Sequence, residues 1–417
     1  MLVEFKVSNY LSINEEQTLS MIANNADKTL LNHFKEFGKY RIKVLRTAGI
    51  FGPNASGKTN MLKACDFMKR LVIFSSKNLP GASTGVVPFK FIKEKDKTLS
   101  KFEITFILDD GILYSYGFEL DEKEIHSEWL YYYPKNQKKK LFQRSKAEGY
   151  QFGSDMKGNN KSIAGMTKEN SLFLSVAAMM NDEKAKNIYA FFNNITPVLN
   201  QIDLLSAAVF MKNIVEYYKK KDDKNRLINF LQKADLGITD FEIKTKNISN
   251  EFGVLRKMLM DKAVEIKSSN KEFDIDNLAI DEINFKHEYN GISGELKINE
   301  ESSGTQKLFF LLPFFVENKG IILIDELESS MHPHIMNFLL DFYYDIYPDS
   351  QLIFTSHNSD LLDTEKFRRD EIWFTEREKN GSTSLFSLDD IKPKPRLEDD
   401  IKMRYLYGQY GAIPKIA

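Results

Sequence analysis

The chain has 417 residues, of which 42% are hydrophobic, and its 58 basic and 59 acidic side chains nearly cancel. This apolar content excludes a disordered chain and suffices for one large core or two smaller ones, and the near-zero net charge excludes a strong overall attraction to nucleic acid or anionic lipid. The single cysteine, Cys65, excludes an intrachain disulfide and a cysteine-clustered metal site, and it fits a reducing compartment.

The first residues show neither the basic start nor the long apolar core of a secretory signal: they read MLVEFKVSNYLSI. No apolar run reaches the roughly 18 residues that a membrane-spanning helix needs. We therefore expect a cytoplasmic protein without a membrane partner.

Residues 1–182 are expected to form an N-terminal lobe of short strands, many of them antiparallel. Five segments are rich in β-branched and aromatic residues, as is typical of strands: LVEFKVSNY, LRTAGIFG, KFEITFIL, ILYSYGFEL and SEWLYYY. Turn patterns such as LDDGIL separate neighbouring segments by only a few residues, which favours antiparallel pairing.

Within this lobe, the segment GPNASGKT matches the pattern G-x-x-x-x-G-K-[ST]. A strand is predicted over residues 45–51 before it and an amphipathic helix from Thr59 after it, which is the setting of a phosphate-binding loop. In such a loop, backbone N–H groups face the phosphates of ATP, Lys58 neutralises the β and γ oxygens, and the Thr59 hydroxyl binds Mg²⁺. The predicted nucleotide-binding residues are Gly52, Pro53, Asn54, Ala55, Ser56, Gly57, Lys58, Thr59 and Asn60.

Residues 183–279 are predicted to form a helical insertion. Apolar residues recur there at three- and four-residue spacing, with charged residues between them, in AAVFMKNIVEYYKKKDDKNRLINFLQKA and in EFGVLRKMLMDKAVEIK.

Two lysine-rich clusters are candidate binding sites for nucleic acid: KNQKKK at 135–140 and YYKKKDDK at 217–224. Either could contact a phosphate backbone, and either could equally be an exposed turn or helix face.

Residues 280–417 are expected to form a C-terminal lobe in which strands and helices alternate. A polar stretch at 301–307, ESSGTQK, is predicted to be a turn. An apolar strand then ends in two adjacent acids, of which Asp325 is expected to hold Mg²⁺ and Glu326 to polarise the attacking water as general base. A second apolar strand ends in the segment TSHN, where the imidazole of His357 could contact the γ-phosphate.

The ordered set GPNASGKT, SSGTQ, ILIDELESSMHP and FTSHN resembles the ATP-binding-cassette (ABC) type of head found in SMC proteins, RecF, RecN and the overcoming-lysogenization-defect nucleases. The chain is most similar to the prokaryotic AAA-family ATPases of abortive-infection and other anti-phage loci. That family typically carries patterns like three segments of this chain: FKVSNYLSI at 5–13, PFKF at 88–91 and YLYGQYGAIP at 405–414. The resemblance implies an α/β fold, an ABC/SMC-type ATPase head with a mixed β-sheet lobe and a helical insertion.

The resemblance also implies a site shared between two subunits. In this family two ATP molecules lie between two copies that dock head to tail. Ser303, Gly304 and Gln306 would then contact the ATP bound by the phosphate loop of the partner copy, and His357 would be the switch histidine. The segment reads S-S-G-T-Q where many cassettes have L-S-G-G-Q, so it departs from the common pattern at two positions.

These features together predict an enzyme that hydrolyses ATP to ADP and phosphate with Mg²⁺, with Lys58, Glu326 and His357 as its catalytic residues. The resemblance implies the sensor ATPase of an anti-phage system, triggered by DNA or a phage protein and acting with a separate effector, a nuclease or a toxin. No TOPRIM-like acidic domain is expected, because few residues follow His357. An alternative stays open: a DNA-maintenance ATPase of the RecF or SMC sort, which binds DNA directly.

Overall fold

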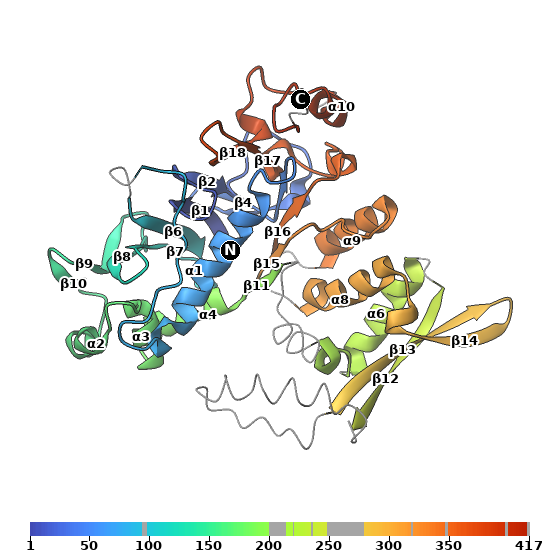
Figure 1. Ribbon diagram of the computed structural model, residues 1–417, viewed down its shortest axis with the longest axis horizontal. Coiled ribbons are helices and arrows are strands. Elements are labelled where there is room, and N and C mark those ends of the chain that lie inside the picture. Colours follow the sequence, from blue (N-terminus) through green and yellow to red (C-terminus); the bar gives the residue numbers. More distant parts are fainter. Residues whose placement is uncertain are drawn as a thin grey trace. The chain divides into compact units, whose positions relative to one another are not determined.

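The computed structural model describes residues 1–93, 98–199, 214–219, 221–234, 237–247, 279–317, 320–346, 349–396 and 399–414 (Figure 1). The chain divides into two compact units. The first comprises Met1–Gln201, Glu317–Ser329 and Leu339–Ala417, and the second comprises Ile202–Val316 and Ser330–Phe338.

A seven-stranded antiparallel sheet forms one layer of the first unit, in the order β10-β9-β8-β7-β6-β1-β2. Side chains alternate between its two faces: in β6, Phe102, Ile104 and Phe106 are buried, whereas the residues between them are partly exposed. This alternation packs one face against the core. The strands are β1 (Leu2–Ser8), β2 (Gln17–Ser20), β6 (Ser100–Ile107), β7 (Leu113–Leu120), β8 (Ile125–Tyr132), β9 (Lys139–Ser145) and β10 (Gly149–Phe152).

A six-stranded sheet forms the second layer, in the order β11-β15-β16-β5-β17-β18. All its neighbouring pairs are parallel except β17 and β18. Its central strands β5, β15 and β16 are buried along their whole length, because a parallel sheet is covered on both faces. The strands are β5 (Thr47–Phe51), β11 (Ile195–Val198), β15 (Ile321–Ile324), β16 (Gln351–Ser356), β17 (Ile372–Arg377) and β18 (Thr383–Ser387).

One hydrophobic core joins the two sheets through helix α1 (Lys58–Phe74). Phe5 of the antiparallel sheet, Met68 of α1 and Ile353 of the parallel sheet all belong to it. The remaining helices of this unit, and a separate two-stranded sheet, are α2 (Asn160–Met166), α3 (Phe173–Met179), α4 (Glu183–Asn193), α10 (Ile401–Leu406), β3 (Phe34–Phe37) and β4 (Ile42–Leu45). This is the α/β class with a mixed β-sheet lobe that the sequence predicts.

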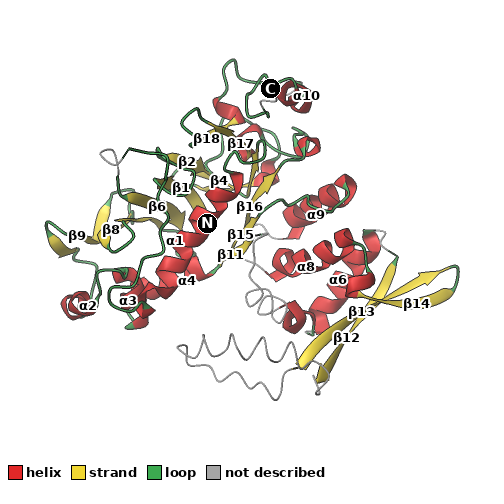
Figure 2. Cartoon of the chain, in the orientation of Figure 1, coloured by secondary structure: helices red, strands yellow, loops and turns green. Residues whose placement is uncertain are grey.

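The second unit packs helices against a three-stranded antiparallel sheet, which Figure 2 shows in yellow. Its core is aromatic: the rings of Tyr218 and Phe309 stack with centroids 4.0 Å apart, and Phe241 and Phe285 lie against Phe309. Helix α9 runs from this unit into the first. The elements are α6 (Lys221–Lys233), β12 (Ile238–Asn247), β13 (Ala279–Tyr289), β14 (Ile292–Lys297), α8 (Ser303–Glu317) and α9 (Pro333–Ile346).

The segment expected to be a helical insertion differs in part from the prediction. Residues 238–247 form strand β12 because their apolar side chains alternate, and Phe241 and Ile243 pair with Phe285 and Ile283 of β13. Helix α4, which the expected boundaries place in the helical insertion, belongs to the first compact unit. The helix-like sequence at 251–267 lies outside the described residues.

Among the described residues, no helix is both long and apolar enough to cross a membrane.

Candidate nucleotide site

The segment GPNASGKT forms the connection between β5 and α1, as its pattern predicts. Both of its glycines have positive φ angles, +147° at Gly52 and +105° at Gly57. A Cβ on Gly52 would lie 2.5 Å from the carbonyl oxygen of Thr375, and one on Gly57 would lie 1.9 Å from Oγ1 of Thr383. Glycine is therefore required at both positions, by conformation and by the close approach of neighbouring groups.

Hydroxyl groups from distant segments brace this loop. Ser56 Oγ lies 2.6 Å from Thr375 Oγ1 of β17. Thr383 Oγ1 of β18 donates to the carbonyl of Ser56 (2.9 Å) and lies 2.7 Å from Ser12 Oγ, which also accepts from Asn60 Nδ2 (2.7 Å). The sequence analysis named Ser56 and Asn60 but missed the three bracing hydroxyls. No local motif marks them, because their positions follow only from the sheet order.

Lys58 is the buried cation of the loop, with 7% of the residue exposed. Its Nζ donates to the carbonyl oxygens of Gly52 (2.7 Å) and Pro53 (3.0 Å). Burial lowers the pKa of Lys58, and the negative charges of three nearby carboxylates oppose that lowering. The ammonium group thus lies inside the curve of the loop, at the start of α1, where no side chain caps the helix.

The sheet order brings the phosphate loop and the acidic strand end together, although they are far apart in the sequence. Strands β15, β16 and β5 are adjacent and parallel, so their carboxyl ends share one edge of the sheet. There, Thr59 Oγ1 donates to Asp325 Oδ1 at 2.9 Å. Thr355 Oγ1, at the end of β16, donates to the same carboxylate oxygen at 2.6 Å. The predicted metal ligands Thr59 and Asp325 are therefore in direct contact.

Glu326 has a φ of +50°, which is uncommon for a residue other than glycine. Its N–H donates to Thr355 Oγ1 at 2.8 Å, and the next N–H, of Leu327, donates to the Thr355 carbonyl at 3.1 Å. Thr355 thus holds both acids: its hydroxyl accepts from the backbone of Glu326 and donates to Asp325. Such local strain is most often found at functional sites.

His357 follows β16 and lies beside an acid that the sequence analysis did not single out. Its backbone N–H donates to Glu328 Oε1 at 2.8 Å, and its Nδ1 lies 3.1 Å from the same oxygen. The signal for Glu328 was present in the segment IDELE, whose first two acids were named and whose third was not.

The segment ESSGTQK is helical from its third residue, not a turn as expected. Helix α8 begins at Ser303, and the Ser302 hydroxyl accepts from the N–H of Thr305 (3.1 Å). A serine in this position caps the helix, which explains why the helix begins at this point. The Gln306 side chain bonds back to the carbonyl of Glu301 (2.9 Å).

Gly304 lies at a crowded point of the second unit. A Cβ there would be 2.5 Å from the carbonyl oxygen of Ser330. Ser303, by contrast, is exposed. The first turn of α8 therefore approaches the backbone near Ser330 closely, while its serine, Ser303, is exposed.

The sequence profile of one family matches residues 48–363, a range that includes the phosphate loop, Asp325 and His357. The family is described as "AAA domain, putative AbiEii toxin, Type IV TA system". The chain belongs to this AAA-domain family. AAA domains are ATPase domains, and the expected resemblance to AAA-family ATPases is confirmed. A comparison with proteins of curated function finds no match.

Among the solved structures that resemble the AAA-domain chain are three SMC heads. The head from Thermotoga maritima has 12% identity and a TM-score of 0.41, over 93% of this chain and 98% of that chain. The head bound to the C-winged helix domain of ScpA has 13% identity and a TM-score of 0.43, over 93% and 97%. A head with an extended coiled coil, bound to the C-terminal domain of ScpA derived from Pyrococcus furiosus, has 13% identity and a TM-score of 0.38, over 93% and 96%.

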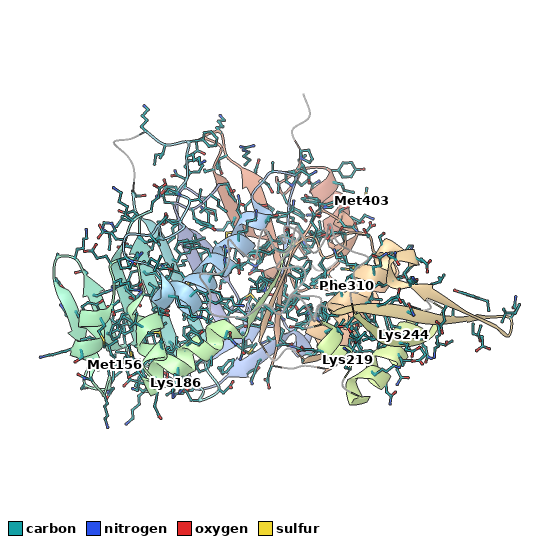
Figure 3. The ribbon with its side chains drawn as sticks, turned by 60° about the horizontal axis from the view of Figure 1, so that its bottom comes forward. Met156, Lys186, Lys219, Lys244, Phe310 and Met403 are labelled. Atoms are coloured by element: carbon teal, nitrogen blue, oxygen red, sulfur yellow. The ribbon has the colours of Figure 1, made fainter. Side chains whose placement is uncertain are left out.

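The lysine clusters of this AAA-domain protein have local partners. Lys219, labelled in Figure 3, pairs with Asp281 at 3.0 Å, and Lys224 pairs with Asp240 at 2.9 Å. In the other cluster, Lys139 lies 3.5 Å from Asp155 and the ammonium of Lys138 lies 4.0 Å from the Tyr131 ring centroid. These contacts give no support to direct binding of a nucleic-acid backbone.

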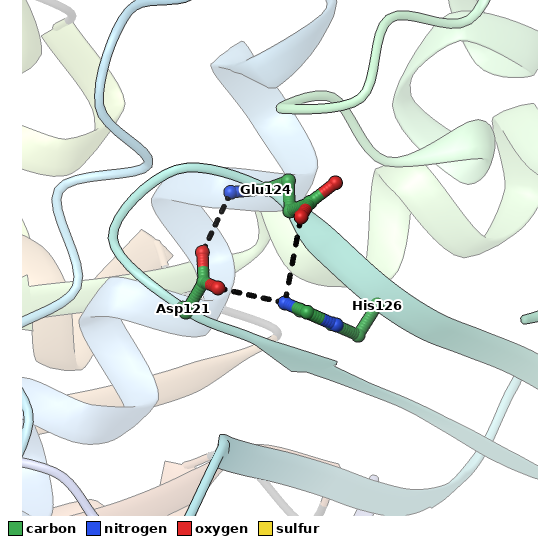
Figure 4. A group of neighbouring side chains, drawn as sticks. All are labelled: Asp121, Glu124 and His126. Carbon is green, nitrogen blue, oxygen red and sulfur yellow. Dashed lines mark hydrogen bonds and ion pairs between the residues drawn. The ribbon is translucent and has the colours of Figure 1, made fainter. Parts of the chain in front are cut away.

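Another group of titratable side chains lies in the turn between β7 and β8 (Figure 4). His126 Nε2 is 2.7 Å from Asp121 Oδ2 and 3.8 Å from Glu124 Oε1, and Asp121 Oδ1 accepts from the N–H of Glu124. Glu124 also pairs with Lys146. These bonds close the turn and pair its charges, so we assign the group a structural role.

Proposed function

We propose that this chain is a Mg²⁺-dependent ATPase whose nucleotide site is formed by the phosphate loop and the acidic end of β15. The observation that carries the proposal is the 2.9 Å contact between Thr59 and Asp325, which joins the two halves of the site at one sheet edge. A hydroxyl and a carboxylate are hard oxygen donors of the kind that Mg²⁺ prefers. The two glycines, at which a Cβ would not fit, leave the loop backbone open to phosphate groups.

Each predicted residue then has one role in the proposal. Thr59 and Asp325 would hold Mg²⁺, which when bound neutralises phosphate charge. Lys58 exchanges the carbonyls of Gly52 and Pro53 for phosphate oxygens of the substrate. Glu326 accepts a proton from the attacking water, and His357 contacts the transferred phosphoryl group.

The site is completed, in this proposal, by a second copy of the chain. Ser303, Gly304 and Gln306 would contact the nucleotide held by Gly52–Asn60 of the partner copy. Support comes from the first turn of α8, where Ser303 is exposed and Gly304 lies too close to the carbonyl of Ser330 to carry a side chain. A homodimer, or a higher oligomer built from such pairs, would bury two ATP molecules.

The family match further supports a role in defence, since its description names a toxin and a type IV toxin–antitoxin system. We propose that the ATPase is the sensor or regulatory component of an abortive-infection system and that a separate nuclease or toxin is its effector. DNA or a phage protein would be the trigger.

The test is steady-state hydrolysis of ATP by the purified chain with and without Mg²⁺. We expect phosphate release that depends on Mg²⁺ and falls at least about a hundredfold in Lys58→Ala, because the phosphate charge is then unpaired in the loop. Exchange of an exposed lysine, Lys123→Ala, is the control and should leave the rate unchanged. Equal rates in the wild type and Lys58→Ala would refute the assignment of the site.

A further inference from the structure

The turn after β15 buries a carboxylate that the proposed catalytic roles do not use. Glu328 has 7% of its surface exposed, and among the described residues its Oε2 atom has no hydrogen-bond partner. A buried carboxylate with an unpaired oxygen destabilises a fold, because the charge has lost its water without full compensation. Such groups call for an explanation, and a catalytic site is a common one.

Two other buried glutamates of the same unit show what a structural carboxylate looks like in this protein. Glu128 accepts from the N–H groups of Phe173 and Leu174 and pairs with Arg144 at 3.0 Å. Both of its oxygens are used.

Glu371 is satisfied in the same way: one oxygen binds His33 Nδ1 (2.8 Å) and the N–H of Arg368 (2.9 Å), and the other accepts from the Tyr344 hydroxyl (3.3 Å). Glu328 is different, because within the described part of the chain its hydrogen bonds all run from a single oxygen, Oε1, to a single residue.

That residue is His357, and Glu328 holds it at two points. Oε1 of Glu328 accepts from the backbone N–H of His357 at 2.8 Å and lies 3.1 Å from Nδ1 of the ring. Two contacts to one oxygen fix both the position of the residue and the rotation of its imidazole. Because Nδ1 and Nε2 lie on opposite edges of the ring, the Nδ1 contact leaves Nε2 free, on a side chain that is 52% exposed.

Glu326 precedes Glu328 by two residues in the same turn. Its backbone is bound to Thr355, at the end of the neighbouring strand. The carboxylate of Glu328, by comparison, bonds to His357.

We propose that Glu328 is a positioning residue for His357: it orients the imidazole with Nδ1 as the donor to its carboxylate and leaves Nε2 to donate to a phosphate oxygen of the nucleotide. Only the second part of this inference, donation from Nε2 to a phosphate oxygen, rests on the proposed ATPase function. For Nε2 and Nδ1 to donate together, the ring must carry both protons, and the Glu328 carboxylate supplies the opposite charge beside it. Glu328 itself does not touch the reacting atoms.

The first test does not depend on activity. In protein labelled with ¹⁵N-histidine, the ring signals of His357 are assigned among the six histidines by their loss in His357→Ala. We expect a proton on Nδ1 in the wild type and in Glu328→Gln, which keeps an acceptor oxygen. In Glu328→Met, which has similar length and no acceptor, the Nδ1 proton should be lost. Identical His357 signals in the wild type and Glu328→Met would overturn the proposal.

The second test is kinetic. Glu328→Met should lower kcat by about 10- to 100-fold, as is usual when the partner of a functional histidine is removed, while KM stays within about threefold because binding is unchanged. Glu328→Gln should recover part of that loss. The double variant Glu328→Met/His357→Ala should be as slow as His357→Ala alone, since residues that act as a unit are not additive.

Several results would contradict the proposal. If Glu328→Met turns over like the wild type, or if its effect multiplies fully with that of His357→Ala, Glu328 does not act through the histidine. Glu365→Gln, which removes an exposed acid of the same unit, is the control and should change nothing. If the wild type itself released no phosphate, the proposed ATPase function would fail. The histidine signals would still show whether Glu328 accepts a hydrogen bond from Nδ1 of His357. Burial of an apolar side chain of similar size usually costs less free energy than burial of an incompletely paired carboxylate, so we expect Glu328→Met to fold.

Discussion

Glu326 combines two features that make it the most informative residue of the site. Its backbone lies in the left-handed region at φ +50°, and its N–H donates to the Thr355 hydroxyl. We expect Glu326→Gln to keep the same backbone and the same bond to Thr355, because neither involves the carboxylate. The amide cannot accept a proton, so hydrolysis should fall by about 10²- to 10⁴-fold while ATP binding persists.

This prediction is checked by comparing single-turnover hydrolysis with the affinity for a fluorescent ATP analogue. The control is Glu365→Gln, which makes the same chemical change at an exposed position. Hydrolysis at more than a tenth of the wild-type rate in Glu326→Gln would show that another group accepts the proton.

The sequence placed Thr355 at the end of a strand, but it did not show that its hydroxyl bonds to both Asp325 and the backbone of Glu326. Thr355→Val keeps the shape and removes the hydroxyl that serves Asp325 and the N–H of Glu326. Each group left unsatisfied costs about 1–3 kcal/mol, so the melting temperature should fall and hydrolysis should slow. Thermal denaturation and phosphate release measure the two effects, and Thr98→Val at an exposed site is the control. An unchanged melting temperature together with an unchanged rate of hydrolysis would show that neither stability nor catalysis needs the Thr355 hydroxyl.

At the scale of elements, the connection from β5 to α1 depends on Gly57. Gly57→Ala places a methyl group 1.9 Å from Thr383 Oγ1 at a φ of +105°. The loop must shift to avoid this contact, and we expect nucleotide affinity to fall at least about tenfold, since backbone strain of 1–3 kcal/mol is typical.

Gly81→Ala is the matched control. Gly81 also has a positive φ, +76°, but a Cβ there would meet nothing within 4 Å. This variant should therefore carry a conformational cost without any loss of nucleotide binding. Equal binding by the two variants, measured by equilibrium titration, would mean that the contact with Thr383 does not shape the loop.

Element by element, the sequence predicted what depends on local pattern. The strand, loop and helix around GPNASGKT, and the apolar strand before Asp325, each have a signature within about 20 residues. Prediction from local pattern failed where contacts between distant segments determine the structure. Residues 238–247 form a strand that pairs with β13. The helix start at Ser303, by contrast, has a local signal that the prediction missed, the capping serine Ser302. The hydroxyls of Ser12, Thr375 and Thr383 converge on the loop only through sheet topology.

At the scale of the whole molecule, the account needs two copies of the chain. Ser303 lies in the second compact unit and the phosphate loop lies in the first. In the proposed head-to-tail dimer, the second unit of one copy completes the site in the first unit of the other. Ser303→Arg should therefore abolish hydrolysis without reducing ATP binding by the isolated subunit, whereas Ser293→Arg, on an exposed strand of the same unit, should not.

The most direct test of this central claim is to mix two inactive variants, Lys58→Ala and Ser303→Arg. A mixed dimer would contain one site with both defects and one with none. Random pairing of equal amounts should therefore restore about a quarter of the wild-type rate. The account predicts that recovery, and it predicts none when either variant is tested alone. If both variants fold and dimerise but the mixture stays inactive, the nucleotide site is not shared between subunits.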